Sequence, residues 1–109
     1  MNAYLINLTP HDVNICDDNG RILKIYRASG MVARSPNEYR TVDMVNGVPL
    51  VTRREDYVIG LPEPKEGVMY IVPNIILNIC SERTDLLAPA KQVKINGKVV
   101  GCTAFVSNR

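Results

Sequence analysis

The stretch that decides the fold is "VNICDDNGRILKIY" (13–26), in which two runs with alternating apolar residues flank an Asn-Gly pair. Asn19 and Gly20 both tolerate a positive φ, so this arrangement is among the strongest short signals for a β-hairpin. The same signal recurs at Asn46-Gly47 and at Asn96-Gly97, each between strand-like runs. The sequence therefore predicts three hairpins.

Four further runs have strand character: "AYLINL" (3–8), "MVAR" (31–34), "YVI" (57–59) and "VMYIV" (68–72). The last is apolar throughout, as expected for a strand that is buried on both faces. The segment "GLPEPKEG" (60–67) holds two prolines and two glycines, which predicts a loop with a restricted backbone.

One helix is predicted directly after residue 72. Pro73 suits a first helical turn, and one face of the helix would carry Ile75, Ile76, Ile79 and Cys80. The whole pattern predicts a mostly β (α+β) fold in a single domain over residues 1–109. We expect a compact antiparallel sheet or small barrel of short hairpins with one short helix.

The predicted core follows from these elements. Seven aliphatic side chains are expected to be buried: Leu5, Ile15, Ile22, Met69, Ile71, Ile76 and Ile79. Strand alternation places Tyr70 on the opposite face from its neighbours Met69 and Ile71.

Composition narrows the class of protein. The 109 residues are 46% hydrophobic and 22% charged, which is typical of one soluble globular domain. No apolar run approaches the roughly 20 residues of a membrane span, and the start of the sequence does not resemble a signal peptide, so a cytoplasmic protein without membrane contact is expected. A net charge of +2 does not favour general nucleic-acid binding.

Cys16, Cys80 and Cys102 are widely spaced and odd in number, and the chain has a single histidine. Without a CxxC pair, these cysteines are interpreted as small buried hydrophobes rather than as a disulfide framework or a zinc site. No metal and no cofactor is expected.

Several motifs in this order resemble a family of small bacteriophage and prophage proteins: NLTPHDV (7–13), SGMVAR (29–34), NGVPLV (46–51), GLPEPKEGVMYIV (60–72), RTDLLAP (83–89) and NGKVVGC (96–102). The resemblance spans nearly the whole chain. It implies a phage origin, a small β-rich domain and the host cytoplasm, but no particular activity. The family tends to carry a serine after YIV, whereas this chain has Pro73, which puts a hydroxyl contribution there in doubt.

His11 is the first candidate site residue, because an imidazole can donate or accept a hydrogen bond and Pro10 restricts where the ring projects. Thr9 is its neighbour in the same turn. The alternative is structural: Thr9, His11 and Asp12 would then close a turn, with the hydroxyl and carboxylate capping backbone N–H groups.

Arginines are the second candidate group, since a guanidinium suits bidentate recognition of phosphate or carboxylate. Six were considered: Arg27, Arg34, Arg40, Arg53, Arg54 and Arg83. Arg34 and Arg83 are the most suggestive, with Asp85 placed to orient Arg83 and Tyr70 as a stacking surface for a base. A solvated surface role is the alternative for each arginine.

Enzyme signatures are lacking, since the sequence holds no GxSxG, P-loop, HExxH or dinucleotide-binding glycines. A carboxylate cluster of Asp12, Asp17 and Asp18 with His11 is a minor catalytic alternative. The preferred hypothesis is a binding protein that sequesters an anionic nucleotide signal of bacterial immunity, with a cyclic nucleotide as one candidate ligand.

The rival hypothesis is a structural or adaptor protein that binds a protein partner through a sheet edge or an apolar patch. Under either hypothesis the many short strands leave edges, so a homo-oligomer is expected.

Overall fold

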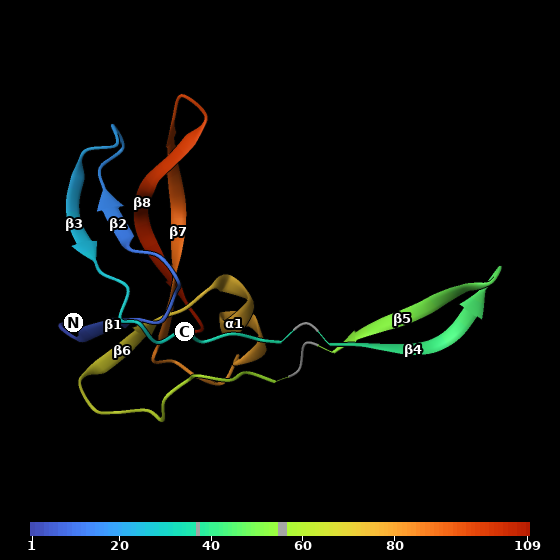
Figure 1. The fold of residues 1–109 in the computed structure, drawn as a ribbon. Helices are drawn as coiled ribbons and strands as arrows, with labels where there is room; N and C mark the ends of the chain where they lie inside the picture. Colours follow the sequence, from blue (N-terminus) through green and yellow to red (C-terminus); the bar gives the residue numbers. More distant parts are fainter. Residues whose placement is uncertain (37, 55–56) are drawn as a thin grey trace.

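The computed structural model describes residues 1–36, 38–54 and 57–109. Its elements are β1 (Tyr4–Asn7), β2 (Val13–Cys16), β3 (Ile22–Tyr26), β4 (Glu38–Val45), β5 (Val48–Arg54), β6 (Val68–Ile71), α1 (Asn74–Ile79), β7 (Leu86–Ile95) and β8 (Lys98–Ser107). Six strands form one sheet in the order β1-β6-β7-β8-β2-β3, and β4 and β5 form a separate two-stranded hairpin (Figure 1). The prediction of a mostly β fold with one short helix is confirmed.

All three predicted hairpins are present, as the antiparallel pairs β2–β3, β4–β5 and β7–β8. In the last two, both turn residues have the positive φ that Asn-Gly turns require. The β2–β3 turn is longer, and Asp17 organises it. Its carboxylate accepts hydrogen bonds from the backbone N–H groups of Asn19 and Arg21, at 3.0 and 2.9 Å.

The large sheet is mixed rather than antiparallel throughout, because β1–β6, β6–β7 and β2–β8 are parallel pairs. Turn signals report only on strands that are adjacent in the sequence, so they contain no information on these pairings. The predicted strands at 31–34 and 57–59 are reduced to one isolated bridge, between Arg34 and Ile59.

The two outer strands of the sheet, β1 and β3, approach each other at one end. Asn7 and Ala28 form an isolated bridge there, and the Ser29 N–H donates to the Asn7 carbonyl at 3.1 Å. Over the described residues this is the only bridge between the two edges, so the sheet curls without closing into a barrel.

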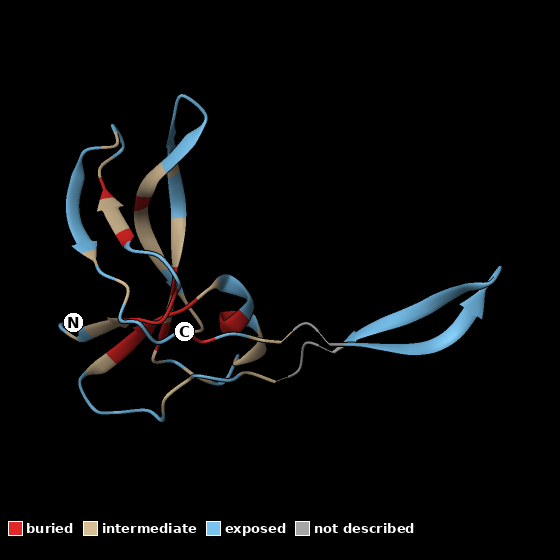
Figure 2. Cartoon of the chain, viewed as in Figure 1, coloured by how far each residue is buried: buried red, intermediate tan, exposed pale blue. Residues whose placement is uncertain are grey.

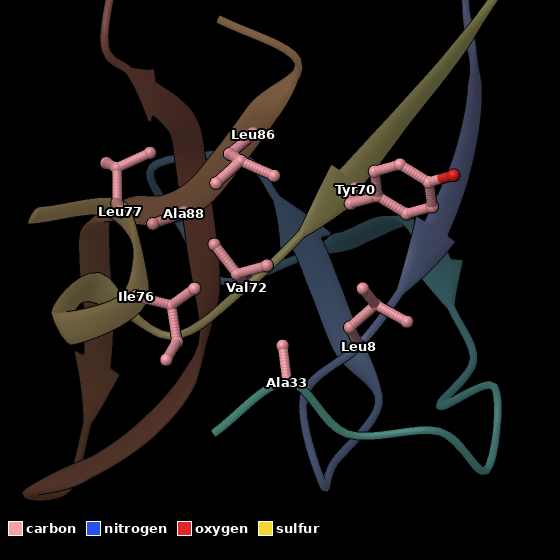
Figure 3. Close-up of a cluster of buried hydrophobic side chains, with 8 residues drawn as sticks. All are labelled: Leu8, Ala33, Tyr70, Val72, Ile76, Leu77, Leu86 and Ala88. Carbon is pink, nitrogen blue, oxygen red and sulfur yellow. The ribbon is translucent and has the colours of Figure 1, made fainter. Parts of the chain in front are cut away.

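The core consists of two clusters that meet at β6. Eight buried side chains form the first: Leu8, Ala33, Tyr70, Val72, Ile76, Leu77, Leu86 and Ala88 (Figure 3). The second contains Val13, Ile71 and Cys102, with half-buried Leu5, Ile15, Tyr26 and Phe105 against it. Tyr70 and Ile71 belong to different clusters, so strand 68–72 is buried on both faces as predicted.

Three of the seven predicted core residues are buried: Met69, Ile71 and Ile76. Leu5, Ile15 and Ile79 are half-buried. The prediction is wrong for Ile22, which is 46% exposed because β3 is an outer strand of the sheet. On the predicted helix face, Ile76 is buried and Ile79 and Cys80 are half-buried, but Ile75 is 41% exposed. The helix buries Leu77 instead, which was not predicted.

Candidate functional site

Asn7 organises the turn that carries the histidine. Its side chain is 2% exposed, and its amide donates to the carbonyl oxygens of His11 and Tyr26 at 2.8 and 2.9 Å. Its Oδ1 accepts from the backbone N–H of Thr9 at 2.9 Å. The Thr9 hydroxyl lies 2.7 Å from Asn7 Oδ1 and 2.8 Å from the His11 carbonyl oxygen. Thr9 is therefore a buried structural residue of this turn.

Asp12 connects the same turn to the end of β3. Its carboxylate accepts from the Ala28 N–H at 2.8 Å and from the Arg27 guanidinium at 3.0 Å. The pKa of this carboxyl is lowered, most by the hydrogen bond from the Ala28 N–H and next by the hydrogen bond from Arg27. The His11 side chain, which lies between Thr9 and Asp12 in the sequence, is exposed.

His11 lines a cleft of about 520 Å³ together with Thr9 and Asp12. The other walls come from the start of α1, from β7 and from β8, including Pro73, Pro89 and Val99. Pro73 gives the cleft an apolar wall. Among the described residues, the lining contains a carboxylate and no arginine or lysine, which is a poor match for an anionic ligand.

Arg83 and Asp85 form a two-point ion pair, as the sequence indicated. The guanidinium Nε and Nη2 atoms donate to the two carboxylate oxygens at 2.7 and 2.8 Å, and Nη2 also donates to the Pro62 carbonyl at 2.9 Å. The hydrogen bonds from Arg83 lower the pKa of Asp85. Three of the five N–H groups of this guanidinium thus bind protein acceptors, and they fix the 60–67 loop to the chain after α1.

The remaining candidate residues lie apart from the His11 cleft. Arg34 is exposed, and its backbone pairs in both directions with Ile59 at 3.0 and 2.9 Å. Tyr70 is 3% exposed, and its hydroxyl donates to the Glu63 carbonyl at 3.3 Å. Its ring packs within the first core cluster (Figure 3), so the predicted stacking surface is replaced by a role in the core. The side chain of Arg54 lies outside the described residues.

A second cavity, of about 390 Å³, is lined by residues of β1, β3, β6, β7 and β8 and of both ends of the chain. We call it the cup. Its floor is apolar, with Leu5 from β1, Met69 from β6 and Leu87 from β7. Its wall carries two aromatic rings, Tyr26 and Phe105, whose centroids are 6.1 Å apart.

The cup also contains the positive charge that the His11 cleft lacks. Lys24 and Arg109 line it, and no carboxylate side chain of the described residues does. The Lys24 ammonium lies 5.0 Å from the centroid of the Tyr26 ring. These residues are not among those predicted from the sequence. The one local signal is the spacing of Lys24 and Tyr26, which strand alternation places on the same face.

The three cysteines are free, with Cys16 and Cys102 buried and Cys80 half-buried, in agreement with their structural interpretation. Burial raises the pKa values of the Cys16 and Cys80 thiols, which lowers their reactivity. Across the described ranges, no group of three or more His, Cys, Asp or Glu side chains is arranged to hold a metal ion. Nor does the described chain contain a helix long and apolar enough to cross a membrane.

Comparison of the chain with protein-family models, curated proteins and solved structures gives no match.

Proposed function

We propose that this protein is a small binding protein that sequesters an anionic nucleotide in the cup. One observation supports the proposal: Lys24 and the rings of Tyr26 and Phe105 line the same cavity, which has an apolar floor. A nucleotide has complementary parts, since its base can stack on an aromatic ring and its phosphate can pair with an ammonium or guanidinium. The volume of the cup lies within the range usual for small-molecule sites.

Sequestration requires no turnover, only groups that are held in place before the ligand arrives. The two rings come from β3 and β8, which are separated in the sheet by β2, so the sheet itself fixes their spacing. Lys24 has no carboxylate partner within the described chain, so its charge is available to a ligand. The resemblance to phage proteins supports a setting in the host cytoplasm, where signals of bacterial immunity are produced.

The test is calorimetric titration of the wild type with a panel of cyclic and linear nucleotides, followed by two substitutions in the cup. Lys24→Ala and Tyr26→Leu are each expected to weaken binding about tenfold or more, which corresponds to ~1.4 kcal/mol. The matched control is Lys94→Ala. This exposed lysine on β7 lines neither the cup nor the His11 cleft, so affinity should not change.

His11→Ala separates the two cavities. If binding is lost in His11→Ala and kept in Lys24→Ala, the nucleotide binds in the His11 cleft and not in the cup. Absence of binding by the wild type to every nucleotide of the panel would refute the proposed function. Ultraviolet absorbance of the supernatant after denaturation offers an independent check on protein made in cells that produce such a signal.

A second candidate function is that of an adaptor for another protein. One observation favours it: the hairpin formed by β4 and β5 exposes large apolar side chains to solvent.

A further inference from the structure

The hairpin of β4 and β5, which we call the arm, extends away from the six-stranded sheet (Figure 1). Its strands pair only with each other, and every arm residue from 39 to 53 is exposed (Figure 2). The radius of gyration is 17.0 Å, whereas about 13 Å is expected for a compact chain of this length. The two-way backbone bridge between Arg34 and Ile59 joins the chain before the arm to the chain after it.

The surface of the arm is unusually apolar for a solvated hairpin. Seven large apolar side chains on it are between 45% and 63% exposed: Tyr39, Val42, Met44, Val45, Val48, Leu50 and Val51. The strand register distributes them over both faces. Tyr39, Met44 and Val51 share one face, and Val45, Val48 and Leu50 share the other.

An isolated two-stranded hairpin is only marginally stable in water, because it has no core of its own. The arm joins the body at its base, but the described residues of the body leave its seven large apolar side chains at least 45% exposed. Apolar side chains on both faces therefore indicate that a further surface packs against the arm.

We infer that the arm is a self-association element, and that in a twofold dimer the arm of each copy packs against the other copy. The seven side chains expose roughly 300 Å² of apolar area per arm, given the area that such side chains bury. Each arm would bury this area of its own and an equal area of the partner. The two arms of a dimer would together bury on the order of 1,200 Å², which reaches the lower limit of a stable interface. In a twofold dimer the apolar surfaces of both arms are covered, and no arm is left exposed to bind a third copy.

The body offers an apolar surface of the kind that an arm can cover. On β3, which is an outer strand of the sheet, Leu23 is 63% exposed and Ile25 is 38% exposed. The dimer is a property of the arm and does not depend on the nucleotide proposal, because no arm residue lines the cup.

The experiment is a measurement of mass by light scattering and sedimentation at tens of micromolar, on the complete chain without ligand. The wild type is expected at twice the 12.1 kDa of one chain. The double variant Val48→Thr, Leu50→Lys is expected at the mass of one chain. Both positions are exposed, threonine keeps the β-branched shape, and the lysine faces Asp43 across the hairpin, so the thermal transition of the body should be retained.

The matched control is Ile75→Lys, which adds the same charge at an apolar side chain of similar exposure on α1, and it should remain dimeric. A wild-type mass of 12.1 kDa would overturn the inference. The surface that packs against the arm would then belong to a different protein. A double variant that stays dimeric would also overturn it, and so would dissociation of Ile75→Lys, since the effect would then not be specific to the arm.

Discussion

The side-chain oxygen Oδ1 of Asn7 accepts two hydrogen bonds from Thr9, one from its backbone N–H at 2.9 Å and one from its hydroxyl at 2.7 Å. The amide nitrogen of Asn7 is used equally fully, by the carbonyls of His11 and Tyr26. One buried amide thus connects the end of β1, the histidine turn and the end of β3. In this structure, the main role of the NLTPH sequence is to hold the turn together, and the turn places His11 at the edge of a cleft.

Asn7→Ala should therefore be strongly destabilising. The substitution leaves several buried polar groups without partners, at a cost of about 2–4 kcal/mol in the free energy of unfolding. The melting temperature should fall by about 10 °C or more in a calorimetric scan. Asn74→Ala removes an exposed amide and should change stability by less than about 0.5 kcal/mol. Equal melting temperatures for the two variants would show that the Asn7 network is not formed.

Asp85 should make folding stability depend on pH in the acid range. Its folded pKa lies below the ordinary 3.8 because of the hydrogen bonds from Arg83. Because the folded pKa is lower than the unfolded one, the ionised carboxylate stabilises the folded state fully when the pH is above the unfolded pKa. This stabilisation is lost as the pH falls below about 4 and through the folded pKa. Urea denaturation between pH 7 and pH 2 should show a smaller loss on acidification for Asp85→Asn than for the wild type.

Asp12 also has a lowered pKa and acts in the same pH range, but it is present in both proteins and cancels in the comparison. Glu82→Gln, an exposed neighbour, serves as the control and should follow the wild-type curve. Parallel acid curves for the wild type and Asp85→Asn would contradict the role of the ion pair.

Gly101 on β8 is expected to tolerate no side chain. A Cβ built there would lie 2.7 Å from the Asn14 carbonyl oxygen and 2.9 Å from the Cys16 sulfur. Gly101→Ala should thus push β2 away from β8, at a cost of about 1–3 kcal/mol in chemical denaturation. Thr103→Ala, two residues along the same strand, should cost less than about 1 kcal/mol, because its hydroxyl makes only one long hydrogen bond of 3.4 Å. A variant Gly101→Ala as stable as the wild type would mean that the two strands can separate at no cost.

The sequence permitted prediction of the hairpins because Asn-Gly turns are local, and of strand 68–72 because burial on both faces requires an unbroken apolar run. It could not predict the parallel pairs, which depend on how loops cross the sheet. The candidate site was only partly accessible for the same reason. Arg83 and Asp85 are close in the sequence and pair as expected, but Lys24 and Phe105 come together only because β3 and β8 flank β2 in the sheet.

The contrast between Ile71 and Ile22 tests the core directly. Both are isoleucines in strands of the same sheet, and both are predicted from the sequence to be buried. Ile71 is fully buried in β6, whereas Ile22 is 46% exposed on the outer strand β3. Ile71→Ala should cost about 2–5 kcal/mol through lost burial and the cavity left behind, and Ile22→Ala should cost less than about 1 kcal/mol. Urea denaturation of both variants measures the difference, and a cost for Ile22→Ala as large as that for Ile71→Ala would show that β3 is covered in solution.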